Sequence, residues 1–166
     1  MPCMTILFCL VFVCFGVGCQ SSTARVPKKS VIILCTGNSC RSQMAEGFWN
    51  EHGGDRWEVV SAGTKPKGAI YPLAVKVMAE KGIDISGQKS KSVTPFLNRH
   101  FDYLVTVCGD AEQSCPTFAN ASKHMHWPFD DPPKASGTDE QKMQVCRRVR
   151  DEIEAKIKQF LALTLK

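Results

Sequence analysis

The sequence contains no internal repeat, no low-complexity tract and no large excess of charge of either sign. Its 21 lysines and arginines are interspersed with 16 aspartates and glutamates. Few aromatic residues stand among these charges, so the pattern argues against a nucleic-acid partner and suits the binding of small anions. A chain of 166 residues has room for one domain with a core of ordinary size, and we expect a monomer.

Cysteine pairs at the spacing of a structural zinc site are absent too. Cys108 and Cys115 are seven residues apart, which is wrong for such a site, and His124 and His126 lack convincing metal spacing. We therefore predict no metal site. Of the nine cysteines, four lie in residues 1–27, and the five that follow are a poor disulfide framework because their number is odd. They suit redox chemistry with at least one free thiol.

The N-terminal segment has almost no charge. Residues 5–18 are nearly all apolar, which is too short for a comfortable membrane span of about 20 residues but long enough for a secretory signal. Cys19 follows Val17 and Gly18, as the lipid acceptor does in a lipoprotein cleavage box. Residues 1–29 are thus predicted to be a leader and tether that exports or anchors a domain at 30–166. A misassigned start codon, with a cytoplasmic protein, is the alternative.

Strands alternate with helices along the rest of the chain. Buried or alternating apolar patterns predict strands at 30–34, 57–61, 103–107 and 124–127, and glycine, proline and apolar spacing predict helices at 41–51, 72–81 and 139–163, with one helical turn at 95–99. This order implies an α/β fold, a doubly wound four-stranded parallel sheet flanked by helices. Sites in such sheets lie at the carboxyl ends of the strands, so Cys35, Cys108 and the loop at Asp131 should share one edge.

The strongest motif directly follows the first predicted strand. A turn that opens a helix directs backbone N–H groups inward, where they favour a tetrahedral dianion, and Cys35 stands at its floor. The planar guanidinium of Arg41 can hold two oxygens of that anion and favours the reactive thiolate. Ser42 can donate a hydrogen bond to the Cys35 sulfur or cap the helix, and Asn38 suits a left-handed turn position. The predicted oxyanion-binding residues are Thr36, Gly37, Asn38, Ser39, Cys40, Arg41 and Ser42.

Several other residues could take part in the chemistry of the site or have a purely structural role. Cys108 and Cys115 could meet across a mobile or helical loop, or be unrelated thiols. Cys40 is a competing partner for Cys35, whereas Cys146 is expected to be inert packing in the long helix. Asp131 could donate a proton to a leaving oxygen or be a solvated turn residue. The loop at 89–92 is expected to be solvated, although an ammonium group there could supplement the anion site.

The segments 35–47, 82–86, 107–116 and 126–132 (CTGNSCRSQMAEG, GIDIS, VCGDAEQSCP and HWPFDDP) resemble the thioredoxin-coupled arsenate reductases, which are built on the low-molecular-weight tyrosine phosphatase fold. The likeness covers about residues 30–163. It implies that arsenate is the substrate, thioredoxin or another thiol reductant the partner, and that no bound cofactor is required. The implied roles are nucleophile for Cys35, oxyanion clamp for Arg41, general acid for Asp131, and shuttle pair for Cys108 with Cys115.

The resemblance also raises the question of a monovalent cation, which some relatives hold near the loop. Asn38, Glu46 and Ser61 match part of that site, but Lys89 and Lys91 fall in the polar loop where relatives can place cation ligands. This departure argues against a cation here.

Two rival functions stay open. A tyrosine phosphatase would need only Cys35, Arg41 and Asp131, but such relatives usually place aromatic residues after the Asp-Pro pair, where this chain has the sequence PKAS at 133–136. That difference and the presence of Cys115 favour the reductase. The third possibility is a membrane-tethered protein that binds or senses oxyanions without turnover.

Overall fold

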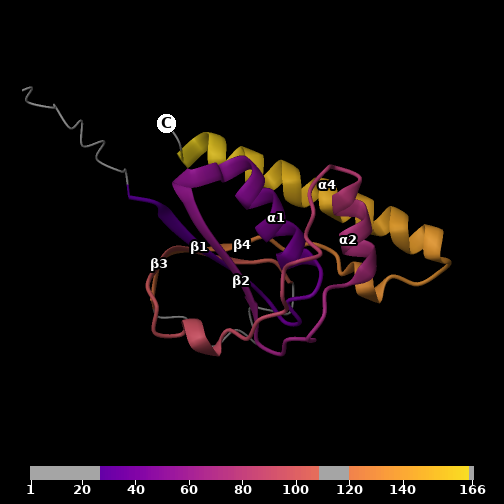
Figure 1. The fold of residues 1–166 in the computed structure, drawn as a ribbon, viewed down its shortest axis with the longest axis horizontal. Helices are drawn as coiled ribbons and strands as arrows, with labels where there is room; N and C mark the ends of the chain where they lie inside the picture. The colour runs from indigo at the N-terminus through magenta and orange to yellow at the C-terminus, as the bar shows by residue number, and fades with distance from the viewer. Residues whose placement is uncertain (1–26, 109–119, 165–166) are drawn as a thin grey trace, which may run out of the picture.

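Four parallel strands form one sheet in the order β2-β1-β3-β4 (Figure 1). Their bounds are Lys29–Cys35 for β1, Trp57–Gly63 for β2, Phe101–Thr106 for β3 and Ala121–His126 for β4. The computed structural model describes residues 27–108 and 120–164, so residues 1–26 of the predicted leader, which include Cys19, and Cys115 lie outside the described residues, whereas Lys29 of that segment already belongs to β1. The predicted four-stranded parallel sheet is confirmed.

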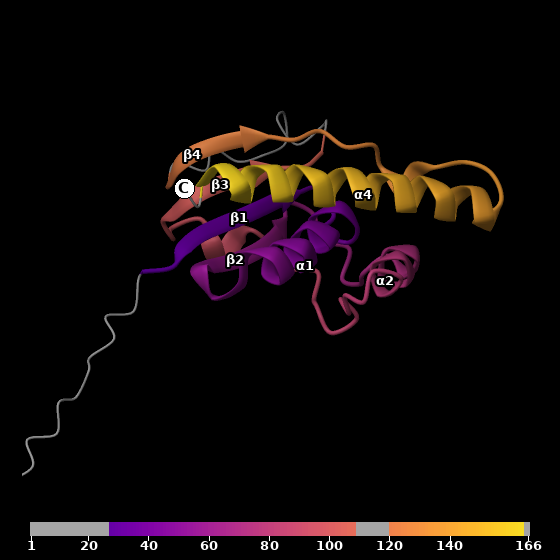
Figure 2. The ribbon, with the colours of Figure 1, turned by 90° about the horizontal axis from the view of Figure 1, so that it is seen from above.

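The two faces of the sheet carry separate hydrophobic clusters, because successive residues of a strand point to opposite sides. On one face Val31 and Ile33 of β1 pack with α1 (Arg41–Gly53), α2 (Pro72–Ala79) and α4 (Asp139–Thr164). Figure 2 shows α4 extending along the sheet with α1 beside it. On the other face Ile32 and Leu34 pack with Phe101 and with residues around the 3₁₀ turn Thr94–Phe96. The central strand β1 is therefore buried on both sides.

Some element bounds differ from the sequence prediction. β4 begins at Ala121, three residues before the predicted start at 124, and its residues Ser122, Lys123 and His124 are exposed. β4 is an edge strand with a polar outer surface, so no apolar pattern marks its beginning. α2 ends at Ala79 instead of residue 81, because the chain leaves the helix in a turn that closes at Gly82, where φ is 76°.

The carboxyl ends of the strands meet at one edge, as predicted. Cys35 ends β1, Cys108 follows β3 by two residues, and Asp131 follows β4 in the loop to a 3₁₀ turn at Pro132–Lys134. All three side chains line the same pocket. Among the described residues, no helix has the length and apolar character needed to cross a membrane.

Candidate active site

The turn between β1 and α1 is shaped by the loop that follows β2. The Lys65 N–H donates a hydrogen bond to the Thr36 carbonyl oxygen (2.8 Å), and the Lys67 N–H donates to that of Gly37 (3.0 Å). A planar trans peptide places its C=O and N–H on opposite sides, so outward carbonyls turn the following N–H groups inward. Such inward N–H groups provide the donors that an oxyanion requires.

Asn38 holds the centre of this turn. Its φ of 42° lies in the left-handed region, which confirms the predicted conformation, and its N–H donates to the Cys35 sulfur (3.0 Å). Its side-chain amide donates to the hydroxyl oxygens of Ser42 (3.0 Å) and Ser61 (2.8 Å). A Cβ on Gly63 would lie 2.7 Å from the Thr36 carbonyl oxygen, so only glycine permits this close approach.

The buried thiol of Cys35 is activated by several donors. A hydrogen bond from Cys108, followed by those from Ser42 and the Asn38 N–H and by the charge of Arg41, lowers its pKa from 9.0 to about 6, although burial opposes them. The Ser42 oxygen lies 3.0 Å from the sulfur and accepts from Asn38, which leaves its own proton for Cys35. Of the two roles predicted for Ser42, the contact with sulfur is the one found. At neutral pH Cys35 is therefore largely a thiolate nucleophile.

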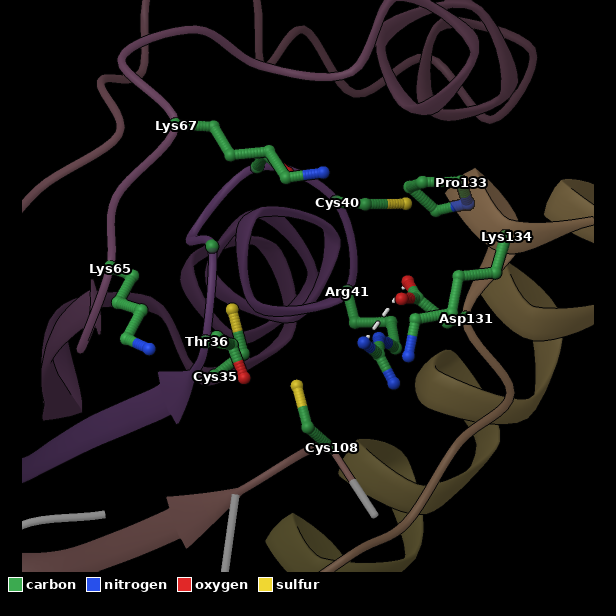
Figure 3. Close-up of a pocket in the computed structure, with 12 residues that line it drawn as sticks. Cys35, Thr36, Cys40, Arg41, Lys65, Lys67, Cys108, Asp131, Pro133 and Lys134 are labelled. Atoms are coloured by element: carbon green, nitrogen blue, oxygen red, sulfur yellow. Dashed lines mark ion pairs between the residues drawn. The ribbon is translucent and has the colours of Figure 1, made fainter. Parts of the chain in front are cut away.

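Cys108 is the donor to that thiolate. It is buried, and its hydrogen bond to Cys35 raises its own pKa, as burial also does. Figure 3 shows both side chains pointing into the same pocket, Cys35 from the end of β1 and Cys108 from the segment after β3. The predicted meeting of Cys108 with Cys115 involves a residue outside the described ranges, so it stays a prediction.

Arg41 reaches across the pocket mouth to the loop after β4. One guanidinium nitrogen lies 3.0 Å from a carboxylate oxygen of Asp131, and another donates to the Phe129 carbonyl oxygen (2.9 Å). The side chain of Asp131 is only 24% exposed. It is therefore held beside the oxyanion cradle and is not a freely solvated turn residue.

These groups surround a pocket of about 480 Å³ (Figure 3). It is lined by Cys35, Thr36, Gly37, Ser39, Cys40, Arg41, Lys65, Lys67, Cys108, Asp131, Pro133 and Lys134. The structure brings the predicted residues of the turn to this pocket, except that Asn38 and Ser42 support it from behind through their contacts with Cys35.

Cys40 has a partner that the sequence did not indicate. Its thiol contacts Cys146 of α4, and both side chains are buried. This contact raises the pKa of Cys40 and lowers that of Cys146, so Cys40 stays protonated as the donor. The sequence predicts Cys40 as a competing partner for Cys35 and Cys146 as inert packing, whereas the structure pairs Cys40 with Cys146. The only sequence signal for the pair is the helical spacing that places Cys146 on the buried side of α4 with Val149 and Ile153.

Glu46, a residue of the possible cation site, is bound by an ammonium group. The Lys91 Nζ lies 3.0 Å from one Glu46 carboxylate oxygen, which also accepts hydrogen bonds from the Ser61 N–H and hydroxyl. Lys91 belongs to the loop expected to be solvated, and its side chain is 30% exposed. Its charge thus neutralises Glu46 behind the turn and does not enter the pocket. Within 27–108 and 120–164, no group of three or more histidine, cysteine or acidic side chains could hold a metal ion.

Lys65, Lys67 and Lys134 complete the pocket and were not among the predicted site residues. Lys65 and Lys67 belong to the TKPKG segment at 64–68, which the sequence marks only as a loop after a strand. Because this basic segment follows a strand at the carboxyl edge of the sheet, the sequence could have indicated that its lysines lie near the anion site.

Known proteins share both the sequence and the fold. An arsenate reductase from Bacillus licheniformis is 52% identical over 133 residues, which cover 80% of this chain and 95% of the relative. A solved structure described as an arsenate reductase in the phosphate binding state has a TM-score of 0.69 and 33% identity, covering 81% of this chain and 97% of that one.

A thioredoxin-dependent arsenate reductase from Corynebacterium glutamicum is a more distant structural neighbour. It has a TM-score of 0.64 and 26% identity, and the match covers 84% of this chain and 65% of that one. Residues 30–166 match the family described as low molecular weight phosphotyrosine protein phosphatase. The fold, the turn that carries Cys35 and Arg41, and these matches together show that the chain belongs to that family.

Proposed function

We propose that the protein is an arsenate reductase that uses a three-cysteine relay of Cys35, Cys108 and Cys115. The observation that carries this proposal is that the Cys35 and Cys108 thiols line one oxyanion pocket, where each shifts the pKa of the other in the opposite direction. Hydrolysis of a phosphate ester needs one nucleophilic thiol, whereas reduction needs a second thiol to supply electrons. The names of the relatives at about half identity agree with this choice.

In the first step, the Cys35 thiolate attacks the arsenic atom of arsenate. The backbone N–H groups of the turn and Arg41 bind the arsenate oxygens as their charge changes. The bond from arsenic to one hydroxyl oxygen breaks, and Asp131, which must first take up a proton from solvent, supplies the proton with which that oxygen leaves as water. The product is a covalent adduct between the Cys35 sulfur and pentavalent arsenic.

In the second step, Cys108 attacks the Cys35 sulfur of the adduct. A disulfide forms between the two sulfurs, the sulfur–arsenic bond breaks, and its electron pair reduces arsenic to the trivalent state that leaves as arsenite. The Cys35 thiolate is the main cause of the raised pKa of Cys108. Once Cys35 is bonded to arsenic, that cause is gone, so Cys108 ionises more readily when its attack is needed.

Cys115 then attacks Cys108, which releases Cys35 as a thiolate and leaves a disulfide between Cys108 and Cys115. We propose thioredoxin or another thiol reductant as the partner that reduces this disulfide. The thioredoxin-dependent neighbour from C. glutamicum supports that choice. The sequence of steps requires no bound cofactor.

The decisive experiment replaces Cys115 by serine. The variant should reduce about one equivalent of arsenate per protein and then stop, because Cys35 and Cys108 are enough for one round. Mass analysis without reductant should find Cys35 bonded to Cys108, whereas the oxidised wild type should carry the bond between Cys108 and Cys115. Cys146→Ala, which removes a thiol outside the relay, is the matched control and should turn over continuously.

Two other functions give different results in the same assay. A tyrosine phosphatase, which the family membership and the Cys35, Arg41 and Asp131 constellation support, would hydrolyse aryl phosphates without oxidising thioredoxin in response to arsenate. A tethered oxyanion sensor would bind arsenate without turnover. Continuous thioredoxin oxidation by Cys115→Ser would refute the three-cysteine relay.

We also propose that residues 1–29 export or anchor the domain. The predicted lipid acceptor Cys19 motivates this hypothesis. In a bacterial host the protein should fractionate with membranes, and Cys19→Ala should change its processing. An unprocessed, fully soluble product that begins near Val26 would support a misassigned start instead.

A further inference from the structure

Two lysine side chains from the loop after β2 face the oxyanion pocket. Lys65 and Lys67 line it on the side opposite Asp131 and Lys134 (Figure 3). Both are exposed to solvent, and neither is needed for the relay chemistry described above. Their position suggests a role in deciding what enters the pocket.

The oxyanion turn itself holds these two lysines in place. Their backbone N–H groups donate to the carbonyl oxygens of Thr36 and Gly37. The aliphatic part of Lys67 packs on the turn, since a Cβ on Gly37 would lie 3.3 Å from the Lys67 Cγ. The ammonium groups are therefore carried by a segment whose distance from the cradle is fixed.

Positive charge is in excess around the pocket. Its cationic side chains are Arg41, Lys65, Lys67 and Lys134, whereas its anionic groups are Asp131 and the Cys35 thiolate. Arg41 is paired with Asp131, so Lys65 and Lys67 contribute much of the positive field at the mouth. Such a field attracts a doubly charged ligand more strongly than a neutral or singly charged one.

The direction from which Cys35 attacks determines which oxygen of the ligand lies near the lysines. A tetrahedral oxyanion attacked by Cys35 directs three oxygens at the cradle and its leaving oxygen away from the sulfur, toward the mouth. In arsenate this oxygen is small and hydrated, whereas in an aryl phosphate it carries an apolar ring. The ring would have to lie beside lysine ammonium groups, which are strongly hydrated and lose water at a cost.

We propose that Lys65 and Lys67 are specificity-determining residues that select free, doubly charged tetrahedral oxyanions over phosphate esters of aromatic alcohols. This inference rests on the proposed function for its natural substrate. Both ligand classes are anions that the lysines attract, so the selection acts against the apolar ring; it is a binding property and can be measured without turnover.

The test uses Lys65→Met, Lys67→Met and the double variant. Methionine keeps an unbranched side chain that can pack on Gly37 but removes the charge. The matched control is Lys76→Met, because Lys76 is exposed on α2, does not line the pocket, and carries the same charge. Each variant is made in the full chain and in the Cys35→Ser background for binding measurements.

The first measurement is calorimetric binding of inorganic phosphate and of phenyl phosphate to the Cys35→Ser proteins at low and high salt. We expect the double variant to bind inorganic phosphate about tenfold more weakly at low salt and to lose most of its salt dependence. The affinity for phenyl phosphate should fall less than the affinity for inorganic phosphate. The second measurement is steady-state arsenate reduction, where KM should rise while kcat is retained.

Equal losses for phosphate and phenyl phosphate would overturn the inference, as would a double variant that behaves like Lys76→Met. A wild-type protein that does not reduce arsenate would refute the proposed function alone. The binding data for phosphate and phenyl phosphate would then still decide whether the lysines favour the free oxyanion over the aryl ester.

Discussion

Replacing Cys108 by alanine should raise the pKa of the Cys35 thiol. The Cys108 hydrogen bond is the largest of the influences that bring this pKa from 9.0 to about 6. A hydrogen bond to a charged group contributes about 1.5–3 kcal/mol, and about 1.4 kcal/mol corresponds to one pH unit. The pKa in Cys108→Ala should therefore rise by about one to two pH units.

The assay is the pH dependence of iodoacetamide alkylation at Cys35, identified by peptide mass analysis. A group with a pKa of about 6 is about nine-tenths ionised at pH 7, and one with a pKa of about 8 is about one-tenth ionised. The rate should increase with pH in both proteins, because only the thiolate reacts. The midpoint of that increase should lie at higher pH in Cys108→Ala.

Cys108→Ser is the matched control, because it also removes the relay thiol but keeps a hydroxyl donor beside Cys35. Its midpoint should lie closer to that of the wild type than the midpoint of Cys108→Ala does. Identical midpoints in Cys108→Ala and the wild type would show that Ser42, Asn38 and Arg41 suffice to ionise Cys35, and the reasoning would be refuted.

The remaining predictions concern the cradle and the start of the domain. Cys35→Ser should abolish both arsenate reduction and any hydrolysis of aryl phosphates in steady-state assays, since serine at its free pKa is a poor nucleophile; residual turnover would remove Cys35 from the mechanism. Arg41→Lys should lower kcat/KM by about 100-fold or more, because a point charge cannot replace the bidentate clamp, and near-normal turnover would mean that the backbone donors are enough. Gly63→Ala should lower the free energy of unfolding in urea by about 1–3 kcal/mol through its clash with Thr36, and an unchanged midpoint would contradict that contact. A chain of residues 28–166 should unfold at the same urea concentration as the full chain, because β1 begins at Lys29, and a lower midpoint would give the leader a structural role.

The sequence predicts those parts of the fold whose local pattern has one interpretation. β1 is clear because residues 31–34 are all apolar, and a strand buried on both faces needs such a run. β4 is an edge strand with exposed Lys123 and His124, so its start depends on pairing with β3, which no local pattern records. The order of strands in the sheet follows from contacts between distant residues in the same way.

The residues of the candidate site also differ in how well the sequence predicts them. Cys35, Asn38 and Arg41 lie close together in one local motif, and the structure places Cys35 and Arg41 in the pocket and Asn38 behind it, although the loop after β2 also holds the turn. The contact between Cys40 and Cys146 joins residues over a hundred positions apart, so packing of α4 alone brings it about. Lys65 and Lys67 are held at the pocket by backbone hydrogen bonds, which any residue type except proline could donate at these positions.

The double attachment of Arg41 links the oxyanion clamp to the segment that carries Asp131. The same guanidinium donates to the Phe129 carbonyl oxygen and pairs with Asp131, so this segment is held partly by the group that binds the anion. An anion that draws Arg41 toward the cradle weakens its hold on residues 129–131. By reciprocity, whatever moves that segment away from Arg41 must change the affinity for the anion by the same factor. Anion binding and the movement of residues 129–131 are thus thermodynamically coupled.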